Sequence, residues 1–158
     1  IRKIVQATEF EEEMEPVCEA YLYASSRAHS LRRIVQPVIK RGGIVIADRS
    51  FITSVAFQGG GRRLGPDVVW NINKIAIDGI SPDMVFFLNL DLDQALERTG
   101  DKIGDKFERM ERDFFKNAAK GYKYAQKKLK NVWRNIDGSK KIEQVHEQIY
   151  KEVLKLVR

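Results

Sequence analysis

Two short apolar runs that do not alternate with polar residues place the strongest constraint on how this 158-residue chain can fold. They are Ile44–Ala47 and Met84–Asn89. Strands that are covered on both faces have this composition, whereas strands with one face in water alternate. We therefore predict buried parallel strands at both runs, and a third strand at Val132–Ile136.

Between the predicted strands, apolar residues recur every three or four positions, which is typical of helices packed on a core. We expect helices over 19–28 and 31–40, with a bend near Ser30 or Pro37, and over 67–79, 105–130 and 141–157. Their predicted core faces carry Val68, Val69, Ile72, Ile75 and Ala76; Met110, Phe114, Ala118, Tyr122, Ala125 and Leu129; and Ile142, Val145, Ile149, Val153 and Leu156. The alternation of helix and strand predicts an α/β fold with a parallel sheet and flanking helices.

Length and composition indicate a single domain over residues 1–158, since 43% hydrophobic residues suffice for one core. The one cysteine, Cys18, cannot form an internal disulfide and fits a reducing compartment. No run approaches the roughly 18 apolar residues of a membrane span. The net charge is +6, and the charged residues are interspersed along the chain rather than clustered. We therefore expect neither a membrane nor a nucleic acid as partner.

Asp48 and Arg49 directly follow the first predicted strand. Ligands bind at the carboxyl ends of strands in open α/β sheets. The carboxylate can hold a hydrated magnesium ion, and the guanidinium can hold a phosphate through two parallel hydrogen bonds. A surface ion pair or a helix N-cap explains the same two residues equally well.

The helix that follows carries hydroxyl and carboxamide groups at Thr53, Ser54 and Gln58. Such groups can read the polar edge of a nucleotide base, although they are also ordinary polar helix residues. The glycines Gly59–Gly61 favour a flexible helix exit over an anion site.

Tyr23 and Arg27 are four residues apart and hence neighbours on one helix face. A ring that stacks on a base and a guanidinium that bonds to it would suit this spacing, while a core position is the more common role for such an aromatic residue. Residues 100–108, GDKIGDKFE, indicate a mobile polar lid or an ordinary solvated loop.

In order along the chain, these segments resemble the thymidylate kinase family over nearly the whole length. The matching stretches are YLYASSRAH, IVIADR, TSVAFQGGGR, the Pro-Asp before VFFLNLD, LERT, DKFE, the Gly-Tyr of KGYKYA, and WRNIDG. The specific part is Asp-Arg followed at fixed spacing by TSVAFQG. The resemblance implies a P-loop nucleoside-monophosphate-kinase-like fold that phosphorylates dTMP to dTDP with ATP and magnesium, a step toward dTTP.

The resemblance also assigns residues. Asp48 and Arg49 would be catalytic, with Asp48 holding magnesium through water and Arg49 holding the acceptor phosphate. The dTMP site would comprise Tyr23, Arg27, Arg49, Thr53, Ser54, Phe57 and Gln58. The donor nucleotide and the lid region, 99–108, would involve Arg98, Lys102 and Lys106.

Several positions depart from the family pattern. Ser50 stands where a Tyr or His usually follows Asp-Arg, and Phe57 replaces a frequent Tyr that crowds the 2′ position of the sugar. The lid carries Lys102 and Lys106 rather than arginine. Since the catalytic arginine in this family comes from either the lid or the phosphate-binding loop, the loop is the expected source here.

The chain starts at Ile1 with IRKIV, which is already amphipathic. The family opens with a strand, a Walker A loop, a helix and a second strand, none of which is found from Ile1 onward. We therefore expect an N-terminal segment with the phosphate-binding loop to precede Ile1. Without that loop, the donor phosphates would lack their main ligands.

Two alternatives to a dTMP kinase remain open. A deoxynucleoside kinase has the same architecture but needs a carboxylate base beside the 5′-hydroxyl, and Arg49 favours a phosphorylated acceptor instead. If the phosphate-binding loop were truly absent, a non-catalytic nucleotide-binding protein would be the better interpretation. The resemblance further implies a homodimer in the cytoplasm that binds small nucleotides.

Overall fold

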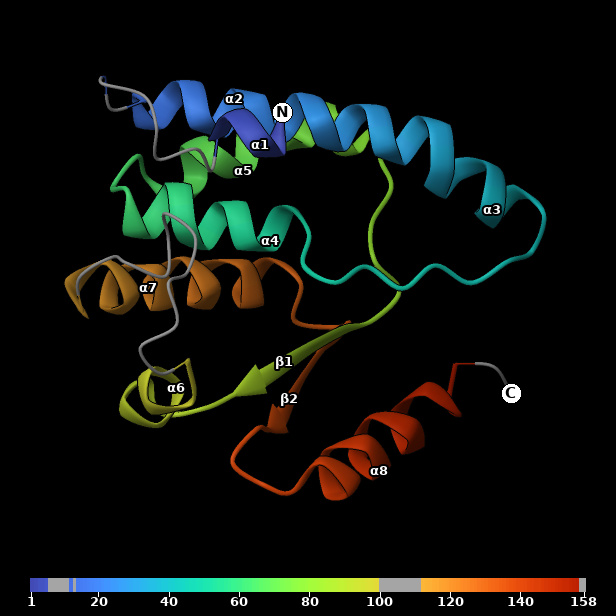
Figure 1. Cartoon of the computed structure of the whole chain (residues 1–158). Coiled ribbons are helices and arrows are strands. Elements are labelled where there is room, and N and C mark those ends of the chain that lie inside the picture. Colours follow the sequence, from blue (N-terminus) through green and yellow to red (C-terminus); the bar gives the residue numbers. More distant parts are fainter. Residues whose placement is uncertain (6–11, 13, 100–111, 157–158) are drawn as a thin grey trace. The chain divides into compact units, whose positions relative to one another are not determined.

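The computed structural model describes residues 1–5, 12, 14–99 and 112–156, and Figure 1 draws the rest as a thin grey trace. The chain divides into two compact units. The first contains Ile1–Ser81 and Gly104–Lys128, and the second contains Pro82–Ile103 and Leu129–Arg158. Among the described residues, no helix combines the length and the apolar character needed to cross a membrane.

The first unit is helical in its described part. Its elements are α1 (Arg2–Val5), α2 (Pro16–Ser30), η1 (Leu31–Val35), α3 (Gln36–Lys40), α4 (Phe51–Ser54), η2 (Val55–Gly61), α5 (Pro66–Ile77) and α7 (Arg112–Lys128), where η marks a π-helix. Helix α4 continues directly into η2, and Figure 1 shows this pair lying between α2 and α7. Helix α5 packs against both α2 and η2.

Where a bend was predicted near Ser30 or Pro37, the structure has a π-helical segment within a continuous helix and no break. Helix α2 runs through η1 into α3 with helical backbone angles at both junctions. Pro37 lies in the first turn of α3, where it cannot donate the backbone hydrogen bond of a regular helix. The π-helical segment shifts the hydrogen-bond pattern by one residue without ending the helix.

Gly59–Gly61 end the helix as expected, since they are the last residues of η2, but the expected flexible exit is wrong because they pack against neighbouring segments and the C-cap is Arg62. Gly60 faces the backbone of α7 at Asn117 and Ala118. On α7, Gly121 faces η2 so closely that an added Cβ would lie 2.6 Å from the Cα of Ala56. Glycine is therefore required here for the close approach of two helices.

The predicted core face of α7 is confirmed at Phe114, Ala118 and Ala125, which are buried. Tyr122 and Leu129 are half-buried, and Met110 lies outside the described residues. The prediction for α5 is wrong in part. Val69 and Ala76 are buried, but Val68 is 44% and Ile75 82% exposed. The buried face of α5 instead includes a polar residue, Asn73.

The predicted strand Ile44–Ala47 is not a strand in the structure. The segment is extended but has no strand partner among the described residues, and Ile46 is 92% exposed. The physical reason is that a β-strand is stabilised by its hydrogen-bonded neighbours, so an apolar run alone does not define one.

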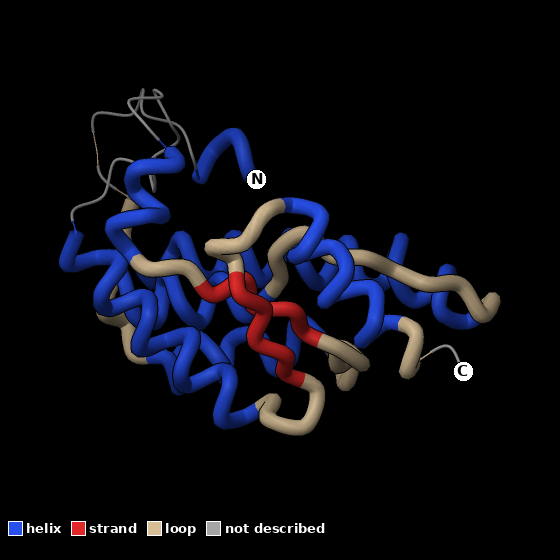
Figure 2. The backbone as a smooth tube through the Cα atoms, turned by 90° about the horizontal axis from the view of Figure 1, so that it is seen from below, coloured by secondary structure: helices blue, strands red, loops and turns tan. Residues whose placement is uncertain are grey.

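The second unit contains the parallel sheet, drawn in red in Figure 2. Strand β1 (Val85–Asn89) pairs with β2 (Trp133–Asp137) from Val85 opposite Trp133 to Asn89 opposite Asp137. The expected strands at 84–89 and 132–136 are thereby confirmed to within one residue. Helices α6 (Leu92–Thr99) and α8 (Ile142–Val153) complete the unit.

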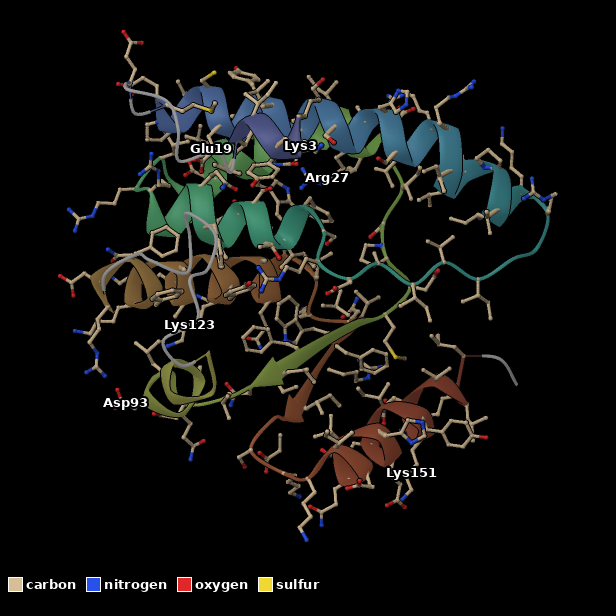
Figure 3. All side chains as sticks on the ribbon, viewed as in Figure 1. Lys3, Glu19, Arg27, Asp93, Lys123 and Lys151 are labelled. Carbon is tan, nitrogen blue, oxygen red and sulfur yellow. The ribbon has the colours of Figure 1, made fainter. Side chains whose placement is uncertain are left out.

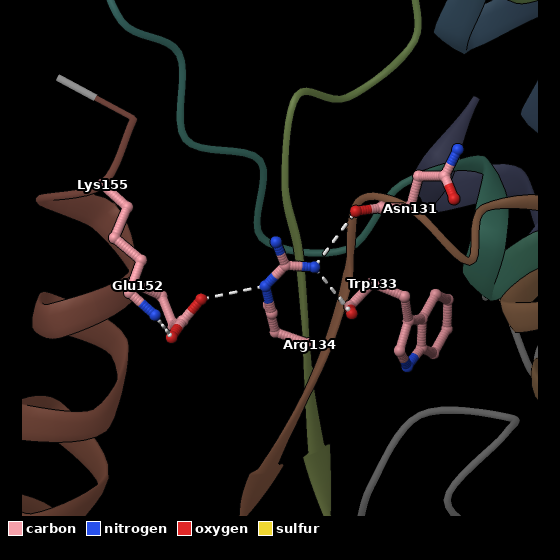
Figure 4. A network of polar contacts seen from close by, with 5 residues as sticks. All are labelled: Asn131, Trp133, Arg134, Glu152 and Lys155. Atoms are coloured by element: carbon pink, nitrogen blue, oxygen red, sulfur yellow. Dashed lines mark hydrogen bonds and ion pairs between the residues drawn. The ribbon is translucent and has the colours of Figure 1, made fainter. Parts of the chain in front are cut away.

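A polar network ties α8 to β2 (Figure 4). Arg134 Nε donates to Glu152 Oε2 at 2.9 Å, and Lys155 also donates to Glu152. Hydrogen bonds from Lys155 and Arg134 hold the pKa of Glu152 below its ordinary value of 4.5. The hydrogen bonds of Glu152 therefore stabilise the unit at neutral pH, and this contribution is lost as the pH falls below the ordinary glutamate range.

Two residues of the core face predicted for 141–157, Ile142 and Leu156, are exposed.

We predict that Gly121→Ala lowers the free energy of unfolding of the protein by about 1–3 kcal/mol, because the new methyl group overlaps the backbone of η2. In an exposed helix the same change would raise it by about 1 kcal/mol. Chemical denaturation measures the difference. The control, Lys123→Ala on the exposed side of α7, should change it by no more than about 0.5 kcal/mol. A rise in stability of the Gly121 variant would contradict the packing.

Candidate functional site

The guanidinium of Arg27 connects three helices of the first unit. From α2, its Nη2 atom donates to the Ser54 hydroxyl oxygen of α4 at 3.0 Å, and its Nη1 atom donates to the side-chain oxygen of Asn73 in α5. Figure 3 shows Arg27 projecting from α2 on the side that faces α4. A guanidinium has five N–H groups, and these two bonds use two of them. The same side chain can therefore also donate to a ligand.

Burial shapes the electrostatics of this group. It lowers the pKa of Arg27 to about 10, and the neighbouring Tyr23 offsets part of the effect. Arg27 is thus still protonated at neutral pH, so a full positive charge is held in a partly desolvated position. Tyr23 lies one helical turn before Arg27 and is half-buried.

Arg49 precedes α4 in an uncommon backbone conformation. Its φ angle is 64°, in the left-handed region that residues with side chains seldom adopt. Its guanidinium carbon lies 5.8 Å from the ring centroid of Phe57, within the range of a cation–π contact. The Phe57 ring in turn packs edge-on against Phe114 of α7, at 5.3 Å between centroids. Arg49 is otherwise exposed, so its charge is open to a ligand.

Tyr122 extends the site from α7. Burial raises the pKa of Tyr122, while a hydrogen bond with the Thr53 hydroxyl and the charge of Arg49 act in the opposite direction. The phenol is therefore protonated at neutral pH. Arg49, Thr53 and Tyr122 consequently form one cluster at the start of α4.

Gln58 is hydrogen-bonded to a buried acid, Glu19. Its Nε2 atom donates to Glu19 Oε1 at 2.8 Å, and the Glu19 side chain is 0% exposed. The second carboxylate oxygen of Glu19 lies 4.0 Å from Arg62 Nε. Arg62 also donates to the Met14 carbonyl oxygen. The hydrogen bond to Glu19 orients the Gln58 carboxamide, because it fixes the amino end of that group.

The structure brings seven of the predicted acceptor-site residues into one region of the first unit. On α2 and along α4–η2 these are Tyr23, Arg27, Thr53, Ser54, Phe57 and Gln58, with Arg49 just before α4. Asp48 precedes Arg49 and is exposed. Arg98 belongs to α6 of the second unit, but its side chain lies outside the described residues, as do Lys102 and Lys106.

The arrangement suits a ligand that is anionic at one end and carries a hydrogen-bond acceptor at the other. Arg49 stands at the start of α4, and Ser54, which holds Arg27, follows five residues later. Aromatic rings of Tyr23 and Phe57 flank the two cations. A nucleotide has the matching parts: a phosphate, a sugar and a flat base with carbonyl groups.

Comparisons with known proteins decide the family. The family model described as "Thymidylate kinase" matches residues 1–149. The chain belongs to the thymidylate kinase family.

Individual relatives agree with this assignment. A thymidylate kinase of Thermosipho melanesiensis is 37% identical over 131 residues, which cover 83% of this chain and 65% of that protein. One of Kosmotoga olearia is 34% identical over 98% of this chain and 74% of its own length. One of Prochlorococcus marinus is 28% identical over the whole of this chain and 74% of its own. The chain thus spans about two thirds to three quarters of the relatives' length.

Three residues of the site, Glu19, Asn73 and Tyr122, were not predicted as site residues from the sequence of this family member. Tyr122 was expected only on the core face of its helix and in the Gly-Tyr match. Asn73 carries the clearest signal, because it falls on the same helical face as Val69 and Ala76, both of which are buried. A polar residue within an apolar stripe is expected to have a specific buried partner. Glu19 and Tyr122 carry weaker signals, since acids and tyrosines are common on half-exposed helices.

The residues that could hold a metal ion are few in the described part of the chain, which contains no group of three His, Cys, Asp or Glu side chains with suitable geometry. Asp48 is exposed next to Arg49. A magnesium ion that is held mainly by substrate phosphates and water needs only one or two carboxylates from the protein. Asp48 fits that more modest role.

Proposed function

We propose that the protein transfers the γ-phosphoryl group of ATP to dTMP and releases ADP and dTDP. The observation that carries the proposal is a pair of guanidinium groups beside α4–η2: Arg27 of α2 is fixed on Ser54, whereas Arg49, just before α4, is open and contacts Phe57. Family membership supports phosphoryl transfer to a nucleotide acceptor. The site described above belongs to the acceptor.

Arg27 lies at the base end of the acceptor. Its guanidinium donates to a carbonyl oxygen of thymine, and Tyr23 supplies a ring for stacking. Ser54 and Gln58 line the same end. A single methyl group separates dTMP from dUMP, which is worth only about 1–3 kcal/mol in an apolar pocket. The enzyme therefore prefers dTMP without excluding dUMP.

Arg49 lies at the phosphate end. Its planar group neutralises the acceptor phosphate and aligns one phosphate oxygen with the γ-phosphorus of ATP. A bond forms between that oxygen and the phosphorus, while the bond to the β-phosphate oxygen breaks and its electrons leave with ADP. Tyr122 of α7, hydrogen-bonded to Thr53, lies near enough to Arg49 to feel its charge. Magnesium would neutralise phosphate charge when bound, and Asp48 would hold it through water.

The donor end completes the proposal. Membership of the thymidylate kinase family supports the fold of P-loop nucleoside monophosphate kinases, and β1 and β2 would be two strands of its parallel sheet. Residues 99–108 act as the lid over ATP, with Arg98, Lys102 and Lys106 near the donor phosphates. Substrates of this kind are found in the cytoplasm, where the protein works.

The proposed homodimer forms through the outer face of α2 and α5. Large apolar side chains are exposed there, with Tyr21 at 60% and Ile75 at 82%. Both border an apolar groove that also includes Ala28 and Ile72. A second copy of this face, related by a two-fold axis, would cover these groups, as is usual for homodimers.

We predict that Arg49→Ala lowers kcat/KM for dTMP by about 100-fold or more, because the acceptor phosphate loses its countercharge and alignment. The full-length protein is assayed by ADP release with dTMP as acceptor. Arg41→Ala, which removes an exposed arginine eight residues earlier, is the matched control and should keep normal turnover. Near-normal turnover of Arg49→Ala would remove this residue from the site.

Ile75→Glu is expected to convert the dimer into a monomer, because it places two charges at the two-fold contact. Light scattering after size-exclusion chromatography gives the mass of each form. Glu152→Gln in the second unit is the control and should leave the mass unchanged. A dimeric Ile75→Glu protein would rule out this face as the interface.

A further inference from the structure

Asn73 is a buried polar residue that the proposed mechanism does not use. It lies in α5 and is 1% exposed, among the most buried side chains in the described part of the protein. A buried carboxamide is tolerated only where its donor and acceptor are both satisfied. The partners of its amino group and of its side-chain oxygen therefore indicate the role of the residue.

The amino end of Asn73 is fixed within its own helix. Its Nδ2 atom donates to the Val69 carbonyl oxygen at 2.8 Å. Because the carboxamide is planar, this bond also sets the direction of the oxygen at the other end. That oxygen faces α2 and accepts a hydrogen bond from Nη1 of Arg27.

Two acceptors on different elements therefore hold the guanidinium of Arg27. Asn73 on α5 binds Nη1, and Ser54 on α4 binds Nη2 at 3.0 Å. Bonds to both terminal nitrogens fix the plane of the group as well as its position, which a single bond would not do. The remaining N–H directions are then set before any ligand arrives, so binding does not have to restrict a flexible side chain.

We propose that Asn73 is a positioning residue for base selection: it locks Arg27 so that the guanidinium presents a donor to the C4 edge of a pyrimidine. The inference rests on the proposed acceptor site and names a specificity determinant within it. Thymine and uracil carry a carbonyl acceptor at C4, whereas cytosine carries an amino donor. A fixed donor opposite that edge accepts a 4-carbonyl pyrimidine and disfavours a 4-amino one.

The selectivity depends on rigidity. A mobile arginine could turn away from the cytosine amino group and make other contacts at little cost. When Arg27 is held on both sides, its N–H group faces the 4-amino group of cytosine, and neither donor has an acceptor. Unpaired buried donors are costly, so such a site discriminates strongly against the wrong base. Asn73 thus acts on the choice between bases, beyond its effect on stability.

The test compares dTMP and dCMP binding to the full-length protein and to Asn73→Leu by isothermal titration calorimetry. Leucine has a similar size but no acceptor. We expect the Kd for dTMP to rise by about tenfold and the ratio of the dCMP and dTMP Kd values to fall toward one. Asn73→Asp keeps an oxygen that can accept from Arg27 but loses the bond to the Val69 carbonyl oxygen, so it should restore part of the preference for dTMP.

The matched control is Asn71→Leu, which changes the same residue type two positions earlier, on the exposed side of α5. Both Kd values should match those of the unchanged protein. If Asn73→Leu weakens dTMP and dCMP by the same factor, or weakens neither, the residue has no role in selection and the inference is overturned. If the unchanged protein binds neither nucleotide, the proposed function fails first and the inference fails with it.

A second measurement needs no substitution at Asn73. Nitrogen-15 NMR of the arginine side chains reports rotation of each guanidinium and exchange of its N–H protons with water. Arg27 should rotate and exchange much more slowly than the exposed Arg41, before and after dTMP is added. Equal rates for the two arginines in the ligand-free protein would show that Arg27 is not locked and would overturn the inference.

Discussion

The buried guanidinium of Arg27 is the constraint on which the first unit depends. A partly desolvated charge is costly unless hydrogen bonds replace the lost water, and here the acceptors come from two other elements, Ser54 and Asn73. Helices α2, α4 and α5 must therefore keep a fixed relation for the charge to be satisfied. The close contact between η2 and α7 adds a fourth element and brings Tyr122 to Thr53. Stability and ligand recognition thus use the same bonds.

Local sequence patterns predicted the elements whose position depends on the spacing of apolar residues. The three- and four-residue spacing in α7 gave its buried residues Phe114, Ala118 and Ala125, and the strands at 84–89 and 132–136 lie where expected. The same reasoning was wrong for Ile44–Ala47, because a strand also needs a partner that composition cannot supply. The glycines of η2 were misread for a related reason: their role is defined by the surface of α7, which is distant in sequence.

The candidate site was predicted as a set of residues but not as a network. Arg27 and Ser54 were each expected to contact a base, yet they also bond to each other. Gln58 was expected to read the base edge, and its amino group is bound to Glu19. Such contacts link residues 27 to 46 positions apart, so no local pattern reveals them. Asn73 is the exception, because a polar residue within an apolar stripe indicates a buried partner.

The most direct test of the account is the choice of acceptor. ADP release from ATP and magnesium is measured on the full-length protein with dTMP, dUMP, thymidine or no acceptor. The account predicts turnover that requires a nucleoside monophosphate and is fastest with dTMP, because Arg49 binds a phosphate and Arg27 a 4-carbonyl base. Turnover with thymidine, or none with any acceptor from folded protein, would contradict it. The first result would favour a deoxynucleoside kinase, and the second would favour a nucleotide-binding protein without this chemistry.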